Sequence, residues 1–321
     1  MSLKRFVQRP LVRAHLRGFR PVGPHPLPLP MRVPPRSSNP QRLGTAFDYL
    51  FRFELHRRNR RAEHGVWVAE LAAKSSGFRA ADLNRFSDFD ELYEHARRQL
   101  RESGRVLRDA KEDVAAYCRK RKPSEDDRAR LASHALRLAA MDEIYRAGIF
   151  SADLTQVDEV AAKELVELLG IVPFENFVSD ARTMLNPGFG KASRIVRGAD
   201  ADLIVGDLLI DVKTTKDGSV EADEIDQLLG YFILARQARS ADKNFPQINR
   251  LGLYYSRHAH LWTWDVSALH DDRAFRAMEQ WFIEASARTI PTTARSDLSA
   301  GHLTSSSKLR PERRARPTEA K

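Results

Sequence analysis

Three charged residues in the stretch 198–213 have the types and spacing of a hydrolytic metal site. Asp202 is followed after eight residues by Asp211, and Lys213 comes two residues later. Hard divalent cations such as Mg²⁺ prefer oxygen ligands, and a bound cation can polarise a phosphate and lower the pKa of a water molecule. A nearby ammonium group can orient that water or steady the developing negative charge. The pattern therefore indicates phosphodiester hydrolysis.

A β-hairpin is expected to bring these residues together. Gly-Asp at residues 206–207 separates two β-rich runs and is a two-residue turn signal, which fixes the register of the strands. Asp202 then lies opposite Asp211, and Asp200 lies opposite Lys213, with Cβ atoms of each pair roughly 5 Å apart. Facing carboxylates repel unless they share a cation or a proton. Asp200 is the alternative to Asp202 as the first metal ligand, although its place opposite Lys213 suits a salt bridge.

This constellation resembles the D…(D/E)XK signature of the PD-(D/E)XK nuclease superfamily. In that family the two acids bind the metal and the lysine assists the attacking water, so the resemblance assigns these roles to Asp202, Asp211 and Lys213. Downstream, Gln227 and Tyr231 resemble the Gln-xxx-Tyr element of the RecB-type branch and share one face of a helix. The resemblance covers residues 155–265. It departs from the family pattern in having no proline before the first acid and aspartate as the second acid.

Two upstream acids are further candidates. Members of this family often add an acid from the helix before the sheet, and Glu164 lies in the apolar stripe of the helix expected over residues 156–169. A carboxylate there needs a partner, and a metal ion is one; the alternative is an edge residue whose carboxylate reaches water. Asp48 ends the segment Gly-Thr-Ala-Phe-Asp at residues 44–48, which has the shape of the RecB-type histidine motif with Asp48 in the place of the histidine.

Helices are expected on both sides of the sheet that holds the hairpin. The strand-like runs are residues 193–197, 200–205, 208–214, 250–256 and 260–264. Helices are expected over residues 156–169, 222–238 and 272–287. One face of the hairpin carries an apolar row suited to a core, which is Leu203, Val205, Leu208, Ile210 and Val212. The order of elements predicts an α/β fold, and the resemblance implies a restriction-endonuclease-like αβα sandwich with a short mixed sheet.

Four segments are expected along the chain. Residues 1–42 are rich in proline and arginine without apolar periodicity, and they predict a disordered basic segment. Residues 43–150 predict an N-terminal helical subdomain and residues 151–288 the nuclease-like core. Residues 289–321 predict a disordered basic tail.

The net charge of +10 lies at the two ends of the chain. Residues 1–42 carry +9 and residues 289–321 carry +4, which leaves −3 for residues 43–288. Basic ends can hold phosphates without reading a nucleotide sequence, although charged tails are also common in proteins of other function. A nucleic acid is therefore the expected partner.

Composition limits where the protein acts. There is one cysteine, and no run of eighteen apolar residues or secretory signal is present, which predicts a cytoplasmic protein without a membrane partner. With the resemblance, the sequence predicts a nuclease that depends on Mg²⁺ or Mn²⁺ and acts on nucleic acid, with DNA favoured by family analogy. The alternative is a catalytically inactive nuclease-fold protein that binds nucleic acid or acts as a scaffold.

Overall fold

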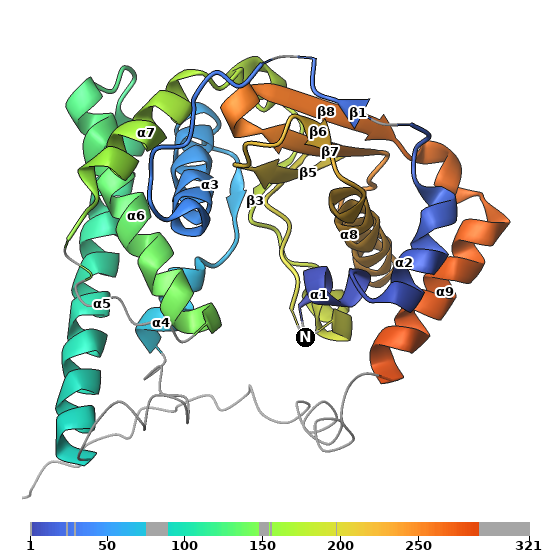
Figure 1. Cartoon of the computed structure of the whole chain (residues 1–321), viewed down its shortest axis with the longest axis horizontal. Helices are drawn as coiled ribbons and strands as arrows, with labels where there is room; N and C mark the ends of the chain where they lie inside the picture. Colours follow the sequence, from blue (N-terminus) through green and yellow to red (C-terminus); the bar gives the residue numbers. More distant parts are fainter. Residues whose placement is uncertain are drawn as a thin grey trace, which may run out of the picture.

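A mixed six-stranded sheet forms the centre of the molecule (Figure 1). The structure is a computed structural model, and it describes residues 2–23, 25–28, 30–74, 89–147, 154, 156–196 and 198–288. The predicted tail at residues 289–321 and the predicted boundary between residues 150 and 151 lie outside the described residues. In sheet order, the strands are β2 (Glu63–His64), β3 (Thr183–Leu185), β4 (Leu203–Val205), β5 (Leu208–Lys213), β7 (Arg250–Tyr255) and β8 (His260–Asp265).

Strand directions in this sheet are mixed, as the sequence predicts. The pairs β3–β4, β4–β5 and β7–β8 are antiparallel, whereas β2–β3 and β5–β7 are parallel. A parallel pair needs a crossover connection, and helix α8 (Ala222–Ala241) supplies it between β5 and β7. A separate two-residue pair joins β1 (His25–Pro26) to β6 (Ser219–Val220).

The predicted hairpin register is confirmed. Val205 pairs with Leu208 and Ile204 pairs with Leu209 across the turn. Gly206, the first turn residue, has a φ of 62°, a left-handed conformation that glycine adopts without steric cost. The register places Asp202 and Asp211 at the open end of the hairpin, one position beyond the last ladder pair.

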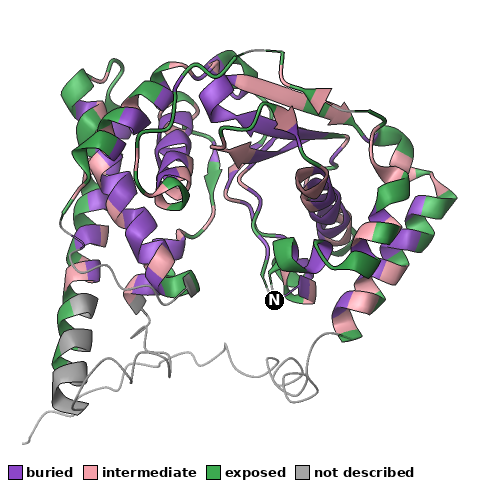
Figure 2. Ribbon diagram, viewed as in Figure 1, coloured by how far each residue is buried: buried purple, intermediate pink, exposed green. Residues whose placement is uncertain are grey.

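Helices cover both faces of the sheet (Figure 1). One core joins the row Leu203, Val205, Leu208 and Ile210 to helices α3 to α7, and Val212 packs against it, as expected for this face. The other core joins Ile204, Leu209 and strand β7 to helices α1, α2, α8 and α9. Figure 2 shows the result, with β5, β7 and most of α8 buried between the layers. The helices have the bounds α1 (Leu3–Val7), α2 (Pro10–Leu16), α3 (Pro40–Arg58), α4 (Val68–Lys74), α5 (Phe89–Arg119), α6 (Glu125–Ala147), α7 (Glu159–Gly170) and α9 (Arg273–Arg288).

The helices expected to form a subdomain share their core with the sheet. Residues of α3, α5 and α6 belong to the same apolar cluster as α7 and one face of β4 and β5. This helical segment is therefore one layer of the molecule rather than a unit with a core of its own.

The prediction of disorder for residues 1–42 is wrong in the part that the structure describes. Helices α1 and α2 bury five apolar side chains against α8 and α9: Leu3, Phe6, Val7, Val12 and Leu16. Gly230 of α8 allows this approach, because a Cβ at that position would lie 2.9 Å from Leu3 Cδ1. The apolar area removed from water outweighs the high content of proline and arginine in this segment.

One predicted strand is absent from the described residues, and two short strands were not predicted. Residues 190–196 form a 3-10 helix, η4 (Gly190–Val196), where a strand was expected over residues 193–197. Strands β2 and β3, of two and three residues, are too short to produce a periodic pattern in the sequence. The remaining 3-10 helices are η1 (Arg17–Phe19), η3 (Phe174–Asn176), η5 (Ser256–His258) and η6 (Ser267–His270).

Within the described part of the chain, no helix has the length and apolar character needed to cross a membrane.

Candidate active site

Strand β5 and helix α8 position the best-connected part of the site. Lys213 Nζ lies 2.6 Å from Asp211 Oδ2 at the end of β5, and Asp211 is only 4% exposed. Gln227 of α8 bridges the two, because its amide nitrogen donates to Asp211 Oδ1 (3.2 Å) and its amide oxygen accepts from Lys213 Nζ (3.1 Å). The same nitrogen donates to the hydroxyl of Tyr231, one turn further along α8 (3.1 Å). The structure thus brings these four predicted residues into one network.

Asp202 joins the site from the neighbouring strand. Its Oδ2 accepts a hydrogen bond from the backbone N–H of Val212 (2.7 Å), which holds the carboxylate across the open end of the hairpin. Val212 stands between Asp211 and Lys213 on β5. The backbone between the second acid and the lysine therefore orients Asp202.

Helix α3 contributes a third acid. The Arg52 guanidinium donates to Asp48 Oδ2 (2.5 Å), while Asp48 Oδ1 is buried without a hydrogen-bond partner in the described residues. Gly44, one turn earlier, places α3 beside the end of β5, since a Cβ there would lie in van der Waals contact with Thr214 Cβ, at 3.8 Å. Asp48, which the sequence marked only by its place in a RecB-type motif, lies close enough to Asp202 and Asp211 for their charges to interact.

Neighbouring carboxylates disfavour the charged forms of Asp202 and Asp48. Burial, with the charges of Asp48 and Asp211, raises the pKa of Asp202 well above its usual range. Burial also raises the pKa of Asp48, although Arg52 opposes this shift. At Lys213 burial acts to lower the pKa, but the Asp211 carboxylate outweighs it and the net direction is upward. Excess negative charge in a buried site is what a divalent cation relieves.

The residues fit a cation that keeps several waters. No group of three or more His, Cys, Asp or Glu side chains in the described residues is arranged to hold a metal ion. Mg²⁺ is usually held by one or two carboxylates together with water and substrate phosphate. Asp202 and Asp211, at the open end of the hairpin, would supply such a pair. Asp48 lies within electrostatic reach of Asp202, and its Oδ1 has no hydrogen-bond partner among the described residues.

Glu164 does not join this group, and its prediction as a metal ligand is corrected. Its carboxylate is fully buried and accepts from Arg257 Nη2 (2.6 Å) and from the backbone N–H groups of Arg36 (2.7 Å) and Ser37 (2.8 Å). These partners compensate its charge, and none of the three belongs to the network around Asp211. The partner that a buried acid needs is an arginine here, so Glu164 fastens the segment before α3 to α7.

Asp200, the alternative first ligand, does not take its predicted place opposite Lys213. It forms an isolated antiparallel bridge with Gly188 and is exposed, so it does not pair with Lys213 as the extended hairpin would require. Strand β4 begins only at Leu203, and the chain diverges from β5 before Asp200. Burial raises the pKa of the Tyr231 hydroxyl, and Asp200 still lies close enough to add to this shift. Asp202 is the acid whose carboxylate is held against β5 by a hydrogen bond.

Glu224 is a neighbour of Lys213 that the sequence did not indicate. The hydroxyl of Tyr255 donates to Glu224 Oε2 (2.5 Å), and Tyr255 pairs with Lys213 in the β5–β7 ladder. Burial raises the pKa of Glu224. Glu224 lies three residues before Gln227, and residues at this spacing share one face of a helix. This spacing is the sequence signal that could have identified Glu224.

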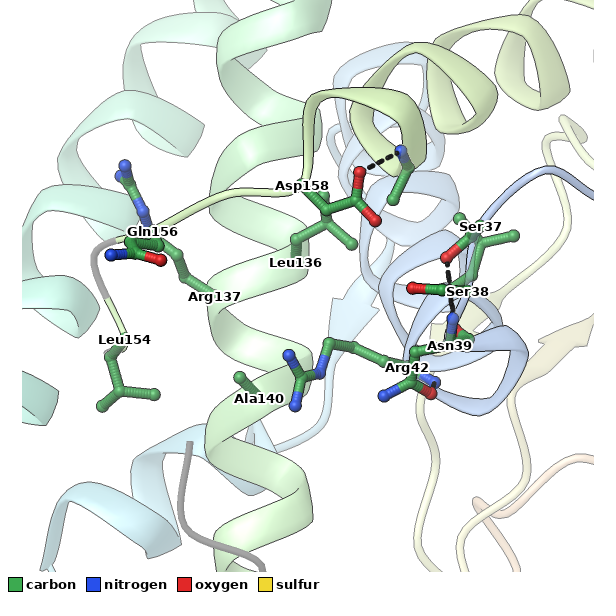
Figure 3. Close-up of a pocket in the computed structure, with 12 residues that line it drawn as sticks. Ser37, Ser38, Asn39, Arg42, Leu136, Arg137, Ala140, Leu154, Gln156 and Asp158 are labelled. Carbon is green, nitrogen blue, oxygen red and sulfur yellow. Dashed lines mark hydrogen bonds between the residues drawn. The ribbon is translucent and has the colours of Figure 1, made fainter. Parts of the chain in front are cut away.

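A cavity of about 200 Å³ lies apart from these residues (Figure 3). It is formed by the beginning of α3, the middle of α6 and the segment before α7, with Arg42, Arg137 and Gln156 on its walls. Arg42 is held by Glu143, and Asp158 caps α7. None of the predicted site residues lines this cavity.

Comparison with known proteins finds no relative of this chain. No family model, no curated protein and no solved structure matches it. Its function is therefore inferred from the acids, the lysine and the helix that holds them.

Proposed function

We propose that the chain is a metal-dependent nuclease of the PD-(D/E)XK type with a restriction-endonuclease-like fold, acting on DNA. The observation that carries the proposal is the network at the end of β5. There Asp211 and Lys213 form an ion pair, Gln227 bridges them, and Asp202 lies across the hairpin. The sequence signature requires acids and a lysine at neighbouring ends of two adjacent strands, and β4 and β5 are adjacent strands in the middle of the sheet.

The layout of the elements supports the same proposal. The antiparallel hairpin β4–β5 is followed by the crossover helix α8 and the parallel strand β7, with helices on both faces of the sheet. This agrees with the αβα sandwich that the resemblance implies. It also explains why a helix residue, Gln227, can reach a pair of strand residues.

The residues divide the work of hydrolysis. Asp202 and Asp211 would hold Mg²⁺ or Mn²⁺, with Asp48 beside them; when bound, the cation supplies charge for the scissile phosphate and acidifies a water molecule. Lys213 stays protonated, because Asp211 favours its charged form and raises its pKa, and it steadies the negative charge that grows on the phosphate. Gln227 keeps the lysine and Asp211 in register, so that neither has to be ordered during reaction.

Cleavage assays with matched variants test the proposal. Linear, circular and single-stranded DNA are incubated with the protein and Mg²⁺ or Mn²⁺. We expect Asp211→Asn and Lys213→Ala to reduce the cleavage rate by about 10²-fold or more, with the circular dichroism spectrum unchanged. The controls Asp217→Asn and Lys243→Ala alter exposed charges outside the site and should cleave as the parent does.

Each other outcome has a definite meaning. If both site variants cleave as fast as the parent, the assignment of the site is wrong. If the parent binds DNA but cleaves none of the substrates with either metal, the chain is the inactive nuclease-fold protein that the sequence leaves as the alternative.

A further inference from the structure

Two arginine-rich segments that are far apart in the sequence meet at one corner of the molecule. One segment ends α3 and the other ends α5, and the two helices pack against each other. We name this cluster the basic corner; its members are Arg57, Arg58, Arg60, Arg61, Arg119, Lys120, Arg121 and Lys122.

Hydrogen bonds to the end of α5 hold the corner together. Arg57 Nη1 donates to the carbonyl oxygens of Lys120 (3.3 Å) and Arg121 (3.2 Å), and Arg60 Nη2 donates to those of Cys118 and Arg119, at 3.5 Å each. The last carbonyls of a helix lack partners within the helix and carry the negative end of its dipole. The carboxyl end of α5 therefore attracts Arg57 and Arg60, although basic residues are already present at that end.

Most of the charge in the basic corner has no internal counterion. Glu54 pairs with Arg57 and Arg58, and Asp127 pairs with Lys120. Within the described residues, no ion pair involves the remaining five exposed cations, which are Arg60, Arg61, Arg119, Arg121 and Lys122. Residues 43–288 carry a net charge of −3, so this positive charge is concentrated locally. Close cations repel, and a polyanion relieves that repulsion.

The basic corner shares a helix with the candidate active site. Arg58 follows Asp48 by ten residues on α3, which corresponds to about 15 Å along the helix axis. A DNA strand advances about 3.4 Å per nucleotide, so the two places are about four nucleotides apart. One rigid helix thus fixes the distance from the basic corner to the acids.

We propose that the basic corner binds the phosphate backbone of the nucleic acid a few nucleotides from the bond to be cut. The choice of nucleic acid as the polyanion rests on the proposed function. The chemistry required is a row of phosphates, without base recognition, because arginine and lysine side chains on an exposed surface meet phosphates first.

Salt-dependent binding of a labelled DNA duplex tests the proposal. Binding is measured without divalent metal in Asp211→Asn protein, so that cleavage plays no part. The corner variant carries Arg61→Gln, Arg119→Gln and Arg121→Gln. The matched control carries Lys191→Gln, Lys243→Gln and Arg273→Gln, three exposed cations outside the corner that remove the same charge. The slope of log K against log salt is negative. We expect its magnitude to decrease by about 0.9 for each phosphate that the corner variant no longer binds, hence by up to about 2.7, and to stay unchanged in the control.

Two results overturn this proposal. One is an unchanged slope and affinity in the corner variant, and the other is an equal reduction in the matched control, which indicates that only net charge matters. Neither result bears on cleavage. If the basic-corner proposal fails in this way and the corner variant with Asp211 restored still cleaves as the parent does, the nuclease proposal stands. Conversely, if the protein never cleaves but only the corner variant shows a slope of smaller magnitude, the basic-corner proposal stands and the nuclease proposal fails.

Discussion

Asp202 experiences burial and two neighbouring carboxylates at once. Each of these raises its pKa, and the backbone hydrogen bond from Val212 and the charge of Arg52 oppose them. A site with this balance is poised to exchange a proton for a cation. The stability of the folded chain should therefore depend on the metal through this residue.

We predict that Mg²⁺ or Mn²⁺ raises the melting temperature and that Asp202→Asn largely removes the rise. A ligand that binds only the folded chain stabilises it by about 2.7 kcal/mol at a hundredfold excess over its dissociation constant. Without metal the variant should be at least as stable as the parent, because one of several opposed charges is gone while an amide oxygen can still accept from Val212. Differential scanning fluorimetry measures both effects, with the exposed Asp217→Asn as control. Retention of the full shift by Asp202→Asn contradicts the prediction.

A second residue-scale prediction concerns Asp142. Burial raises the pKa of Asp142 to about 7, although Tyr49 donates a hydrogen bond to it (2.8 Å). The folded chain then holds a proton between about pH 4 and pH 7 that the unfolded chain releases, so the free energy of unfolding falls as pH rises through that window.

Replacement of Asp142 by asparagine should remove this part of the pH dependence and stabilise the chain above pH 7. Urea unfolding of both proteins from pH 4.5 to pH 8 measures it. Asp126→Asn, at an exposed position of the same helix, is the control and should follow the parent. Parallel curves for parent and Asp142→Asn would show that the carboxyl does not titrate in this window.

At the scale of elements, local signals were predictable and remote contacts were not. The turn at residues 206–207 fixed the register of β4 and β5, and the spacing of Gln227 and Tyr231 on one helix face is present in the structure. These features depend on a few neighbouring residues. Whether α3 reaches the end of β5, and so whether Asp48 joins the site, depends on packing between segments more than 150 residues apart.

Glu164 illustrates the limit. Its place in an apolar stripe correctly indicated burial and the need for a partner. The partner is Arg257, which lies 93 residues away. No pattern within the helix distinguishes an arginine from a metal ion, because both satisfy a buried carboxylate.

We predict that Glu164→Gln destabilises the chain without changing its response to metal. Removal of one partner of a buried ion pair costs about 3–5 kcal/mol, because the other charge stays buried without compensation. Glu167→Gln, which alters a half-exposed acid paired with Arg36 one turn later, should cost about 1 kcal/mol or less. Urea unfolding gives the two values, and thermal shifts give the metal response. A stable Glu164→Gln that no longer responds to metal would restore Glu164 as a ligand.

At the scale of the whole molecule, the first sixteen residues complete the second core. The prolines between residues 21 and 35 favour a prediction of disorder, but Leu3, Phe6 and Val7 have the i, i+3, i+4 spacing that is typical of a helix face. The buried side chains of α1 and α2 face α8 and α9. This segment is part of the fold. Its Arg13, and Arg20 shortly after it, pair with acids of α8.

A pair of substitutions on α2 tests this packing. Leu16 is fully buried, whereas Leu11 is 64% exposed on the same helix. We predict that Leu16→Ala lowers the free energy of unfolding by about 2–5 kcal/mol and that Leu11→Ala changes it by about 0.5 kcal/mol at most. Equal effects in urea unfolding would mean that α2 is not docked on the molecule in solution.

The docking of α1 on α8 has a consequence for synthesis. The apolar residues of α1 and α2 leave the ribosome well before α8, the helix that covers them, which ends at Ala241, more than 200 residues later. At typical rates of about 5–20 residues per second, they remain uncovered for roughly ten to forty seconds. During that interval they are a binding site for chaperones and a target for proteases. A nascent chain halted before α8 emerges keeps these residues exposed. Incomplete molecules therefore expose an apolar surface that is buried in the complete fold.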